Sequence, residues 1–400
     1  MNTDILIVGA GIAGCIMALA MRPRYSVTLI DKYATPQPKP GESLTPAASR
    51  ILKKLDLMNI LSSEKHLICH GISSSWARTH PMITDNLRNP DGMGWHVNRQ
   101  QLEQDLRDAA QARGVQLITP ATVTQATFAQ THWQCMINHS EQKLVKNEQS
   151  LSAAIVIDAT GRHGAFKRQF TVAENNKRQQ LDKLMSIWLS YPSKNSQTLS
   201  TLTPTEEGWW YSAPLPKLPI SNELSPDIRP QDGHYRMLAW QTDADLMDRT
   251  FIGKTQSETQ HGQDPIINAI LAHAAQHRGL AQELETMDTQ HVQYHGMVAA
   301  NSSRLRQVSG QNWFAIGDAA MSFDPLSSQG MFSSMATAMQ LADLLNSAAS
   351  NSEDDLVNVK LTYQREVDNI WSHYQVNHRY YYNQEKRWQN APFWQRRLSL

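Results

Sequence analysis

Residues 4–31 read DILIVGAGIAGCIMALAMRPRYSVTLID, and this stretch decides the fold. The apolar run Asp4–Gly9 is typical of a short buried strand, Cys15–Ala20 of a helix, and Arg24–Asp31 of a second strand. Three glycines, in the pattern Gly-x-Gly-x-x-Gly, stand between the first strand and the helix. This order predicts a βαβ unit, and the unit in turn predicts an α/β fold.

Each glycine of this turn has its own physical role. Gly9 permits the tight turn, Gly11 lets the backbone approach a pyrophosphate, and Gly14 lets helix and strand pack closely. The helix start then offers free N–H groups and a positive dipole end to phosphates. Asp31, 22 residues after Gly9, is placed to accept hydrogen bonds from a ribose. The pattern predicts a dinucleotide site; the alternative is a glycine turn without a ligand.

Composition excludes several classes of protein. The chain has 400 residues, of which 40% are hydrophobic and 18% charged, as in a folded protein of two or three units. Lys+Arg and Asp+Glu are both 37, so no basic excess indicates a nucleic-acid partner. Three scattered cysteines favour the cytoplasm and argue against a disulfide scaffold or a metal site. Glycines interrupt the apolar stretch Ile5–Met21, which argues against a membrane span.

The rest of the chain indicates a discontinuous second domain. A helix is expected over Asn98–Arg113, capped by Asn98 and ended by Gly114, with short strands from 115 to 157. An amphipathic helical stripe begins at Leu356. We expect four parts: 1–184 as the first part of the nucleotide-binding domain, 185–299 as a sheet-bearing α+β substrate domain, 300–350 as the return of the first domain, and 351–400 as a C-terminal helical cap.

Two further motifs place polar groups at strand ends. Residues 155–162 (IVIDATGR) bring Asp158 and Gly161 to a sharp turn, and residues 313–330 (WFAIGDAAMSFDPLSSQG) bring Asp318 to the end of another strand. Asp318 can hold a polyol chain. The segment before Gly330 leads into a helix whose N-terminus can face a developing anion.

Together these motifs resemble the FAD-binding set of the para-hydroxybenzoate hydroxylase superfamily, over roughly residues 4–50, 95–165 and 310–345. That superfamily includes single-component aromatic hydroxylases, geranylgeranyl reductases and flavin-dependent tryptophan halogenases. The resemblance implies FAD as the cofactor, bound in a Rossmann-like domain. It implies FAD contacts for Gly9, Gly11, Ile12, Ala13, Gly14, Asp31, Lys32, Ser43, Arg99, Val123, Asp158, Gly161, Gly317, Asp318, Pro325, Gln329, Gly330 and Met331.

Within the superfamily the chain is most similar to the halogenase-like branch. Residues 41–43 (GES) match its flavin loop, and residues 208–214 (GWWYSAP) correspond to its WxWxIP segment, with Tyr211 at the second Trp and Ala213 at the Ile. Residues 69–78 (CHGISSSWAR) lack the lysine that halogenases carry. The resemblance therefore implies catalytic candidates but argues against halogenation. The candidates are Glu42, Ser43, Trp209 and Tyr211, with plain core packing as the alternative for residues 209–211.

The C-terminal run RYYYNQEKRWQNAPFWQRR, residues 379–397, resembles the tail of a smaller subgroup, the LodB/GoxB type. Those flavoproteins modify a tryptophan of a partner oxidase while cysteine tryptophylquinone is built. The resemblance implies an FAD-dependent monooxygenase whose substrate is a precursor oxidase, and the mixture of aromatic and arginine residues is typical of an interface. The alternative is an amphipathic helix that only covers the substrate domain.

Several alternatives stay open on the sequence. A halogenase or reductase of a small aromatic or lipophilic substrate is one, and a flavin-binding chaperone of a partner is another. The chain has no second Gly-x-Gly-x-x-Gly unit, so electrons are expected from transiently docked NAD(P)H or from external reduced flavin. Acid–base candidates are five histidines, each with an ordinary structural interpretation beside the catalytic one: His66, His70, His96, His163 and His295.

Overall fold

The computed structural model describes residues 1–62, 64–139, 148–170, 177–216, 234–247, 265–348 and 353–398. Its first seven-stranded sheet has the order β8-β2-β1-β11-β10-β9, with β19 paired to β11. The bounds are β1 (Asn2–Val8), β2 (Val27–Ile30), β8 (Gln116–Ile118), β9 (Ala121–Ala129), β10 (His132–His139), β11 (Glu148–Asp158) and β19 (Trp313–Ala315). The expected βαβ unit is confirmed, since β1 and β2 pair in parallel around α1 (Ile12–Met21).

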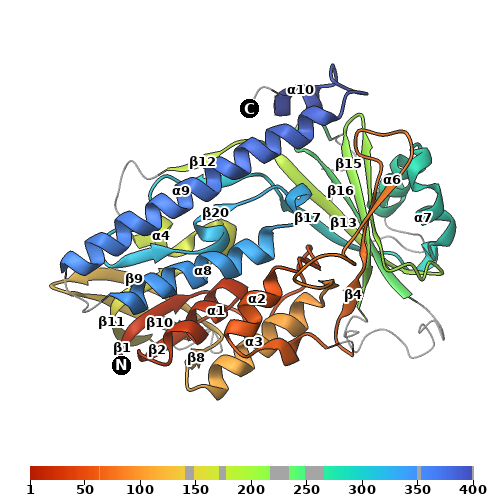
Figure 1. Cartoon of the computed structure of the whole chain (residues 1–400). Helices are drawn as coiled ribbons and strands as arrows, with labels where there is room; N and C mark the ends of the chain where they lie inside the picture. The colour runs from red at the N-terminus through yellow and green to blue at the C-terminus, as the bar shows by residue number, and fades with distance from the viewer. Residues whose placement is uncertain are drawn as a thin grey trace.

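Helices bury one side of this sheet (Figure 1). Apart from Ala20, every residue of α1 is buried, because the helix packs between the sheet, α3 (Arg99–Ala112) and α8 (Gly330–Ser347). The expected cap of α3 is confirmed: the Asn98 side chain accepts a hydrogen bond from Gln101 N at 3.1 Å. Gly114 follows the helix with φ +84°, the left-handed conformation that glycine adopts at little cost.

A second seven-stranded sheet has the order β17-β13-β16-β15-β14-β5-β6. Residues 71–85 therefore join the sheet that the sequence predicts within 185–299, because β5 pairs in parallel with β14. The bounds are β5 (Gly71–Ser74), β6 (Met82–Asp85), β13 (Leu184–Ser193), β14 (Ser200–Thr205), β15 (Gly208–Leu215), β16 (His234–Asp243) and β17 (Gln293–Ala299).

The two faces of this second sheet have different neighbours. α6 (Pro265–Ala275) and α7 (Ala281–Thr286) cover the outer face, which carries Trp210 and Trp240. Trp188, Tyr211 and Ala239 are cross-strand neighbours on the other face. We call this the inner face, because it looks toward the first sheet and its helices (Figure 1). Successive side chains of each strand point to opposite faces. One set packs under α6 and α7, and the other set faces the space between the two sheets.

Smaller elements connect the two sheets. They comprise β3 (Ser43–Leu44), β4 (Leu67–Cys69) and β7 (Gly94–His96) in one three-stranded sheet, β12 (Arg178–Gln180), β18 (Ser303–Leu305) and β20 (Met321–Ser322) in another, and the helices α2 (Ala48–Lys54), α4 (Ala165–Phe170), α9 (Glu353–Gln384) and α10 (Pro392–Leu398). In Figure 1 α9 runs the length of the molecule, from the first sheet to the second. Among the described residues, no helix combines the length and apolar character needed to cross a membrane.

The C-terminal run folds back into the protein. Tyr382, Phe393 and Trp394 are buried in one cluster with Trp209, and Trp394 Nε1 donates a hydrogen bond to Thr205 O at 2.9 Å. The prediction that the whole run is a partner surface is therefore wrong for Tyr382, Phe393 and Trp394. For these residues the alternative holds, that the run covers the substrate domain. Large aromatic side chains serve an internal core as well as an interface, so composition alone does not separate the two uses. Tyr380 and Tyr381 remain exposed, at 60% and 52%.

Candidate functional site

The β1–α1 turn contains two glycines that the protein itself requires. Gly9 has φ +109°, and a Cβ there would lie 2.4 Å from the Ala159 carbonyl oxygen. A Cβ on Gly14 would lie 1.9 Å from Gly9 O. Gly11 differs, because its Cβ would meet only Glu103 Oε2, at 3.9 Å, and no side chain caps the helix that begins after it. Space and free N–H groups at this helix start fit the pyrophosphate of FAD.

Asp31 is held against this turn. Its Oδ2 accepts a hydrogen bond from Ala10 N at 2.8 Å and lies 3.3 Å from the Arg107 guanidinium. Arg107 is buried and also donates to Ala10 O at 2.9 Å. Arg107 thus orders both the turn and the acid, and it was not among the residues predicted from the sequence. In the sequence, Arg107 is marked only by its position one helical turn after Glu103 in α3.

Arg99 ties α3 to the loop that precedes β3. Its Nη1 donates to the carbonyl oxygens of Pro40 and Gly41, at 3.3 and 3.0 Å, and its Nη2 donates to Glu103 at 2.9 Å. Burial alone would raise the pKa of Glu103, but Arg99 and Lys39 outweigh it and hold this pKa below its usual value. Arg99 therefore fixes the loop that carries Glu42 and Ser43, and its predicted contact with an FAD phosphate stays a prediction.

Two more of the predicted motifs meet at adjacent strand ends, because β11 and β19 pair in parallel with Asp158 beside Ala315. Asp158 is fully buried, and its Oδ1 accepts hydrogen bonds from the Thr160 backbone and hydroxyl. The Asp318 carboxylate is one third exposed and lies 3.6 Å from Arg162. Asp318 is therefore the acid of this pair that is free to meet a ribityl chain, and Asp158 shapes the turn beside it.

We expect Asp318→Ala to lower flavin occupancy several-fold without unfolding the protein. The reason is that the variant removes a partly exposed acceptor whose nearest cation, Arg162, is 3.6 Å away. The measurement is the flavin-to-protein absorbance ratio of the purified variant, with the thermal midpoint as a check on folding. Asp343→Ala is the matched control, since that exposed acid on α8 forms a surface ion pair with Lys54, away from the flavin motifs. Full occupancy in Asp318→Ala would remove this residue from the site.

The buried Asp324 side chain holds the loop before α8 through hydrogen bonds. This buried carboxylate accepts hydrogen bonds from Leu326 N at 2.8 Å and from the Tyr382 hydroxyl at 2.7 Å. Burial would raise the pKa of Asp324, but His378 and Arg397 lower it further than burial raises it. Asp324 was not among the predicted site residues. The predicted residues follow it in the chain: Pro325 begins the short 3-10 turn that Asp324 caps, and Gln329, Gly330 and Met331 lie at the uncapped start of α8.

The remaining predicted contacts lie around the first sheet. Ile12 and Ala13 form the first turn of α1, and Val123 is buried in β9. That strand begins beside Asp31, because Ala121 N donates to Asp31 O at 2.8 Å. Gly161 and Gly317 both have positive φ, and Lys32 is exposed with its ammonium 4.6 Å from the Tyr33 ring. These positions surround the predicted FAD path, and each individual contact stays a prediction.

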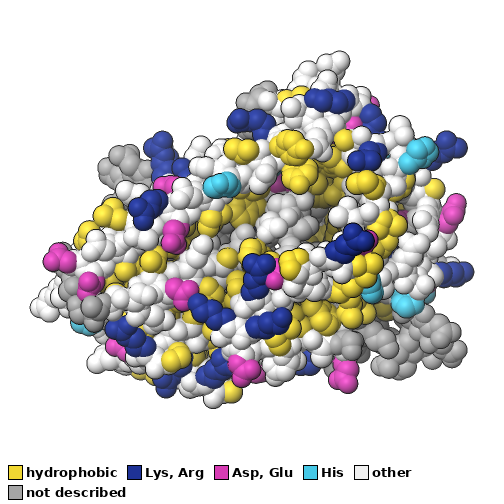
Figure 2. Space-filling view, in the orientation of Figure 1, with side chains coloured by type: hydrophobic (Ala, Val, Ile, Leu, Met, Phe, Trp, Pro, Cys, Tyr) yellow, Lys and Arg dark blue, Asp and Glu magenta, His cyan; other side chains and the backbone are white. Residues whose placement is uncertain are grey.

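Glu42, just before β3, and Tyr211, in β15 of the second sheet, are joined by a hydrogen bond. The Tyr211 hydroxyl donates to Glu42 Oε1 at 2.8 Å and lies 3.0 Å from Ser200 Oγ. Burial raises the pKa of Glu42, opposed in part by the Tyr211 hydrogen bond, and the other carboxylate oxygen has no hydrogen-bond partner among the described residues. Ser43 follows in β3, paired with His96. The surface is hollowed between the two sheets, as Figure 2 shows.

Glu42→Gln is expected to flatten the pH dependence of stability. Because the folded pKa is raised, the folded protein holds the proton more tightly than the unfolded chain does. Stability is therefore highest below the ordinary glutamate pKa of about 4.3 and falls as the pH rises through the folded value. The substituted amide keeps an acceptor for Tyr211 and cannot ionise. Thermal midpoints between pH 4 and 8 check this, and an equally steep decline in the variant would contradict it.

Trp209 lies deeper than its predicted catalytic role requires. It is 1% exposed, its Nε1 donates to the Tyr382 hydroxyl at 3.1 Å, and its ring meets Trp76 edge-on at 6.4 Å. The core-packing alternative describes this residue. Through Tyr382, which itself donates to Asp324, Trp209 supports the loop before α8 and does not form the wall of the hollow.

His295 lies on the inner face and contacts both a hydroxyl and an aromatic ring there. Its Nε2 lies 2.6 Å from Ser190 Oγ, and its ring stacks on Trp188 with centroids 3.9 Å apart and planes 12° apart. Burial lowers the pKa of His295, so the imidazole is neutral at neutral pH. Ser190 is 105 residues away in the chain, and only the pairing of β13 with β17 brings the two together.

The other four candidate histidines have structural or surface positions. His66 Nδ1 accepts from Asn98 N at 3.1 Å, and His96 Nε2 meets Thr198 O at 3.2 Å. His70 meets the Thr198 hydroxyl at 2.9 Å, and His163 is exposed. Of the five histidines that the sequence singled out, His295 is therefore the one that we retain as an acid–base candidate.

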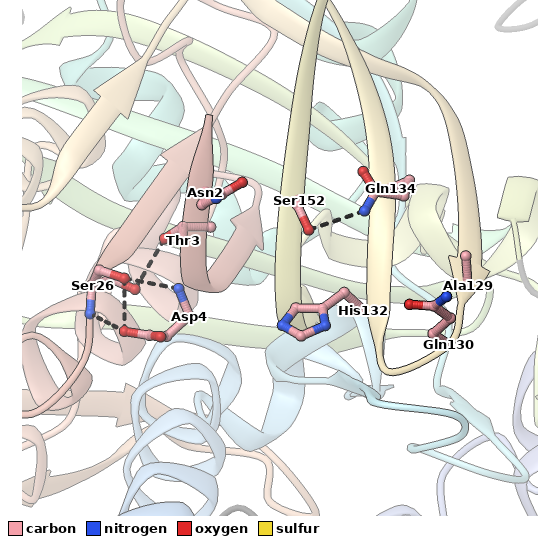
Figure 3. Close-up of a pocket in the computed structure, with 9 residues that line it drawn as sticks. All are labelled: Asn2, Thr3, Asp4, Ser26, Ala129, Gln130, His132, Gln134 and Ser152. Carbon is pink, nitrogen blue, oxygen red and sulfur yellow. Dashed lines mark hydrogen bonds between the residues drawn. The ribbon is translucent and has the colours of Figure 1, made fainter.

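A polar pocket lies at the opposite end of the first sheet's central strands and is distinct from this site (Figure 3). It lies at the beginning of β1, whereas the glycine turn follows the end of β1. Its polar groups largely bond to one another: Ser26 N and Oγ both donate to Asp4 Oδ2 at 2.7 Å, and Gln134 Nε2 donates to Ser152 Oγ at 3.1 Å. The pocket therefore has no part in binding at the carboxyl ends of the strands.

Comparison with known proteins agrees with the geometry of the glycine turn and the Asp318 motif. Residues 2–373 match the family described as "FAD binding domain". The chain belongs to this FAD-binding family. As a member, it is an FAD-dependent oxidoreductase, and the predicted cofactor and mixed α/β fold are confirmed.

Relatives of this oxidoreductase include another FAD-dependent oxidoreductase and a flavin-dependent halogenase. The putative FAD-dependent oxidoreductase LodB of Marinomonas mediterranea is 25% identical over 405 residues, which cover 99% of this chain and 97% of that protein. The flavin-dependent halogenase armH2 of Armillaria mellea is 24% identical over 227 residues, covering 54% of this chain and 43% of the halogenase. The predicted halogenase-like branch is thus confirmed.

Solved structures share the fold at low sequence identity. The peptidyl tryptophan dihydroxylase QhpG, described as essential for tryptophylquinone cofactor biogenesis, superposes with a TM-score of 0.72 at 19% identity, over 99% of this chain and 79% of QhpG. The flavin-dependent halogenase CmlS superposes with a TM-score of 0.77 at 18% identity, over 99% of this chain and 68% of CmlS. Both oxygenating and halogenating enzymes therefore use this architecture.

Proposed function

We propose that this FAD-dependent oxidoreductase is a monooxygenase that hydroxylates a tryptophan side chain of a partner protein, the precursor of an oxidase with a tryptophan-derived quinone. The observation that carries the proposal is the inner face, where stacked Trp188 and His295 form an aromatic wall opposite the flavin-binding domain. QhpG, a peptidyl tryptophan dihydroxylase of the same fold, supports this substrate class. LodB, similar over nearly its whole length, supports the assignment as an FAD-dependent oxidoreductase.

The side chains of the inner face suit an indole. Reduced FAD, when bound, supplies the activation of O2 that oxygen transfer to an electron-rich ring requires. Trp188 is 7% exposed and stacks on the partly exposed His295, so it fixes the plane of that imidazole. His295, neutral because burial lowers its pKa and held by Ser190, can take the proton that the ring loses when the new carbon–oxygen bond has formed.

Tyr211 and Glu42 have a positioning role in this proposal. Their 2.8 Å hydrogen bond connects the inner face to the loop that Arg99 fixes, so it sets the distance between the substrate wall and the flavin loop. Burial and the neighbouring Glu42 raise the pKa of Tyr211 well above its usual value, so its hydroxyl keeps its proton and remains a donor. Electrons come from docked NAD(P)H or from external reduced flavin.

The test is co-expression with precursor oxidases encoded beside this protein, followed by intact mass of each partner. We expect a gain of one or two oxygen masses on one tryptophan. His295→Gln should lower the yield of modified partner while FAD stays bound. His234→Gln is the matched control, since His234 is an exposed histidine of the same sheet. A flavin-loaded wild-type protein that leaves every partner unmodified would contradict the proposal.

Halogenation is the second candidate function, favoured by the halogenase relatives, and we expect it to be absent. Residues 69–78 contain no lysine, and β5 presents Ser73 and Ser74 in that stretch. The protein with reduced FAD, O2, chloride or bromide and free tryptophan should therefore form no halotryptophan. Mass spectrometry of the products checks this, and a chlorinated or brominated product would restore the halogenase assignment.

A further inference from the structure

Three potential metal ligands meet on the outer face of the second sheet. Glu207 lies in the turn between β14 and β15, His273 in the last turn of α6, and His277 two residues after that helix. Their nearest ligand atoms all lie within 4.8 Å of one another. Since α6 covers the sheet on the side away from the FAD-binding domain, this cluster is separate from the hollow between the sheets (Figure 1).

The cluster contains polar atoms that lack hydrogen-bond partners. Glu207 Oε2 and His277 Nε2 are both enclosed, and neither has a hydrogen-bond partner among the described residues. Burying an unsatisfied polar atom costs stability, most of all for a carboxylate.

Two tryptophans form the wall behind these side chains. The Trp240 ring lies 4.3 Å from the His273 ring, and the Trp210 ring lies 5.7 Å from His273 and 6.4 Å from His277. The two indoles stack on each other at 5.7 Å. An apolar wall of this kind restricts the imidazoles and lowers the local dielectric, which strengthens the attraction between a cation and the carboxylate.

We propose that Glu207, His273 and His277 bind a divalent transition-metal ion of the zinc class. Two imidazoles and one carboxylate are a ligand set that zinc uses with its fourth position open, whereas Mg²⁺ and Ca²⁺ prefer oxygen ligands alone. Zinc bonds of about 2.0–2.2 Å require the ligand atoms to move closer together than 4.8 Å. Rotation of the Glu207 side chain, which sits at a two-residue turn, can supply that movement.

The position of the ion suggests its task. Glu207 directly precedes β15, the strand that carries Trp209 and Tyr211. A metal at this turn would connect the β14–β15 hairpin to the end of α6 and hold that strand in place beneath the inner face. The four-residue spacing of the two histidines is visible in the sequence, but the sequence analysis did not use it and argued against a metal site. Glu207, 66 residues before His273, becomes the third ligand only in the folded chain.

The test is isothermal titration of tag-free, flavin-loaded protein with ZnCl2 after removal of metals by a chelator. We expect one ion per chain and a higher thermal midpoint when zinc is present. Glu207→Gln and His277→Gln should each raise the dissociation constant by at least about tenfold. His234→Gln, which changes an exposed histidine of the same sheet, should leave it unchanged.

A second measurement reports the place of binding. Cu²⁺ or Ni²⁺ at this cluster should quench part of the tryptophan fluorescence, because Trp210 and Trp240 adjoin the ligands. Glu207→Gln preserves size and should lose this quenching while its flavin content stays that of the wild type. Absence of stoichiometric zinc binding in the wild type, or binding and quenching that both survive in Glu207→Gln and His277→Gln, would overturn the proposal.

Discussion

Replacement of Arg397 by alanine is expected to destabilise the protein by about 3–5 kcal/mol at pH 7. Arg397 is fully buried and binds Asp243 through one terminal nitrogen at 2.7 Å and the other at 3.2 Å, while its guanidinium stacks on Phe393 at 3.6 Å. Removing the cation leaves the Asp243 carboxylate, itself 1% exposed, deprived of its buried partner. The loss should be large because a buried charge without compensation is costly.

The neighbouring residue is the matched control. Arg396 also contacts Asp243, at 2.9 Å, but it is 39% exposed and its other contacts are with the partly exposed Asp245. Arg396→Ala should therefore cost about 1 kcal/mol or less. Urea unfolding followed by tryptophan fluorescence compares the two variants. Equal, small losses would show that α10 is not held to the second sheet by a buried ion pair.

Gly14→Ala and Gly11→Ala are expected to separate packing from cofactor binding. A Cβ at position 14 would lie 1.9 Å from Gly9 O, so Gly14→Ala should be destabilised by about 1–3 kcal/mol or more and should also lose FAD. A Cβ at position 11 would meet nothing closer than 3.9 Å. Gly11→Ala should therefore keep the stability of the apoprotein and bind FAD at least about tenfold more weakly, a loss of about 1.4 kcal/mol.

Flavin titration and thermal unfolding of the apoproteins measure these two effects. If Gly11→Ala binds FAD as tightly as the wild type, then the open space beside Gly11 is not where the pyrophosphate lies. If Gly14→Ala folds and binds normally, the close approach of α1 to β1 is not required.

Local rules predicted several elements around the first sheet well. The glycine turn, the Asn98 cap and the ending of α3 at Gly114 depend on a few adjacent residues whose backbone preferences leave little choice. The strand preceding Asp318 was predicted for the same reason, since an apolar run ends at a glycine with positive φ. In each of these cases the physical cause lies within a few residues of the feature.

Contacts between distant segments could not be predicted in this way. Residues 71–85 could be seen as short strands, but nothing local determines that β5 pairs with β14. His295 meets Ser190, and Arg107 meets Ala10, only after the sheets and helices have packed. Each of these pairings depends on tertiary contacts between segments far apart in the chain, and a single sequence does not specify such contacts residue by residue.

The C-terminal run shows the limit of composition most clearly. Aromatic and arginine residues are typical of interface anchors, and the same side chains here form an internal cluster around Tyr382 and Trp394. Deleting residues 379–400 would therefore expose Trp209 and Trp76 and should unfold the second domain. A partner surface on this segment is limited to exposed residues such as Tyr380 and Tyr381.

The most direct test of tryptophan hydroxylation is the fate of ¹⁸O2 in a reaction of the purified flavoprotein, a reductant and the precursor oxidase. Peptide mass spectrometry should find one or two ¹⁸O atoms on a single tryptophan of the partner, while free tryptophan under the same conditions stays unmodified. Rapid oxidation of the reduced flavin with no ¹⁸O in any partner peptide, or efficient labelling of free tryptophan, would contradict a monooxygenase that acts on a protein side chain.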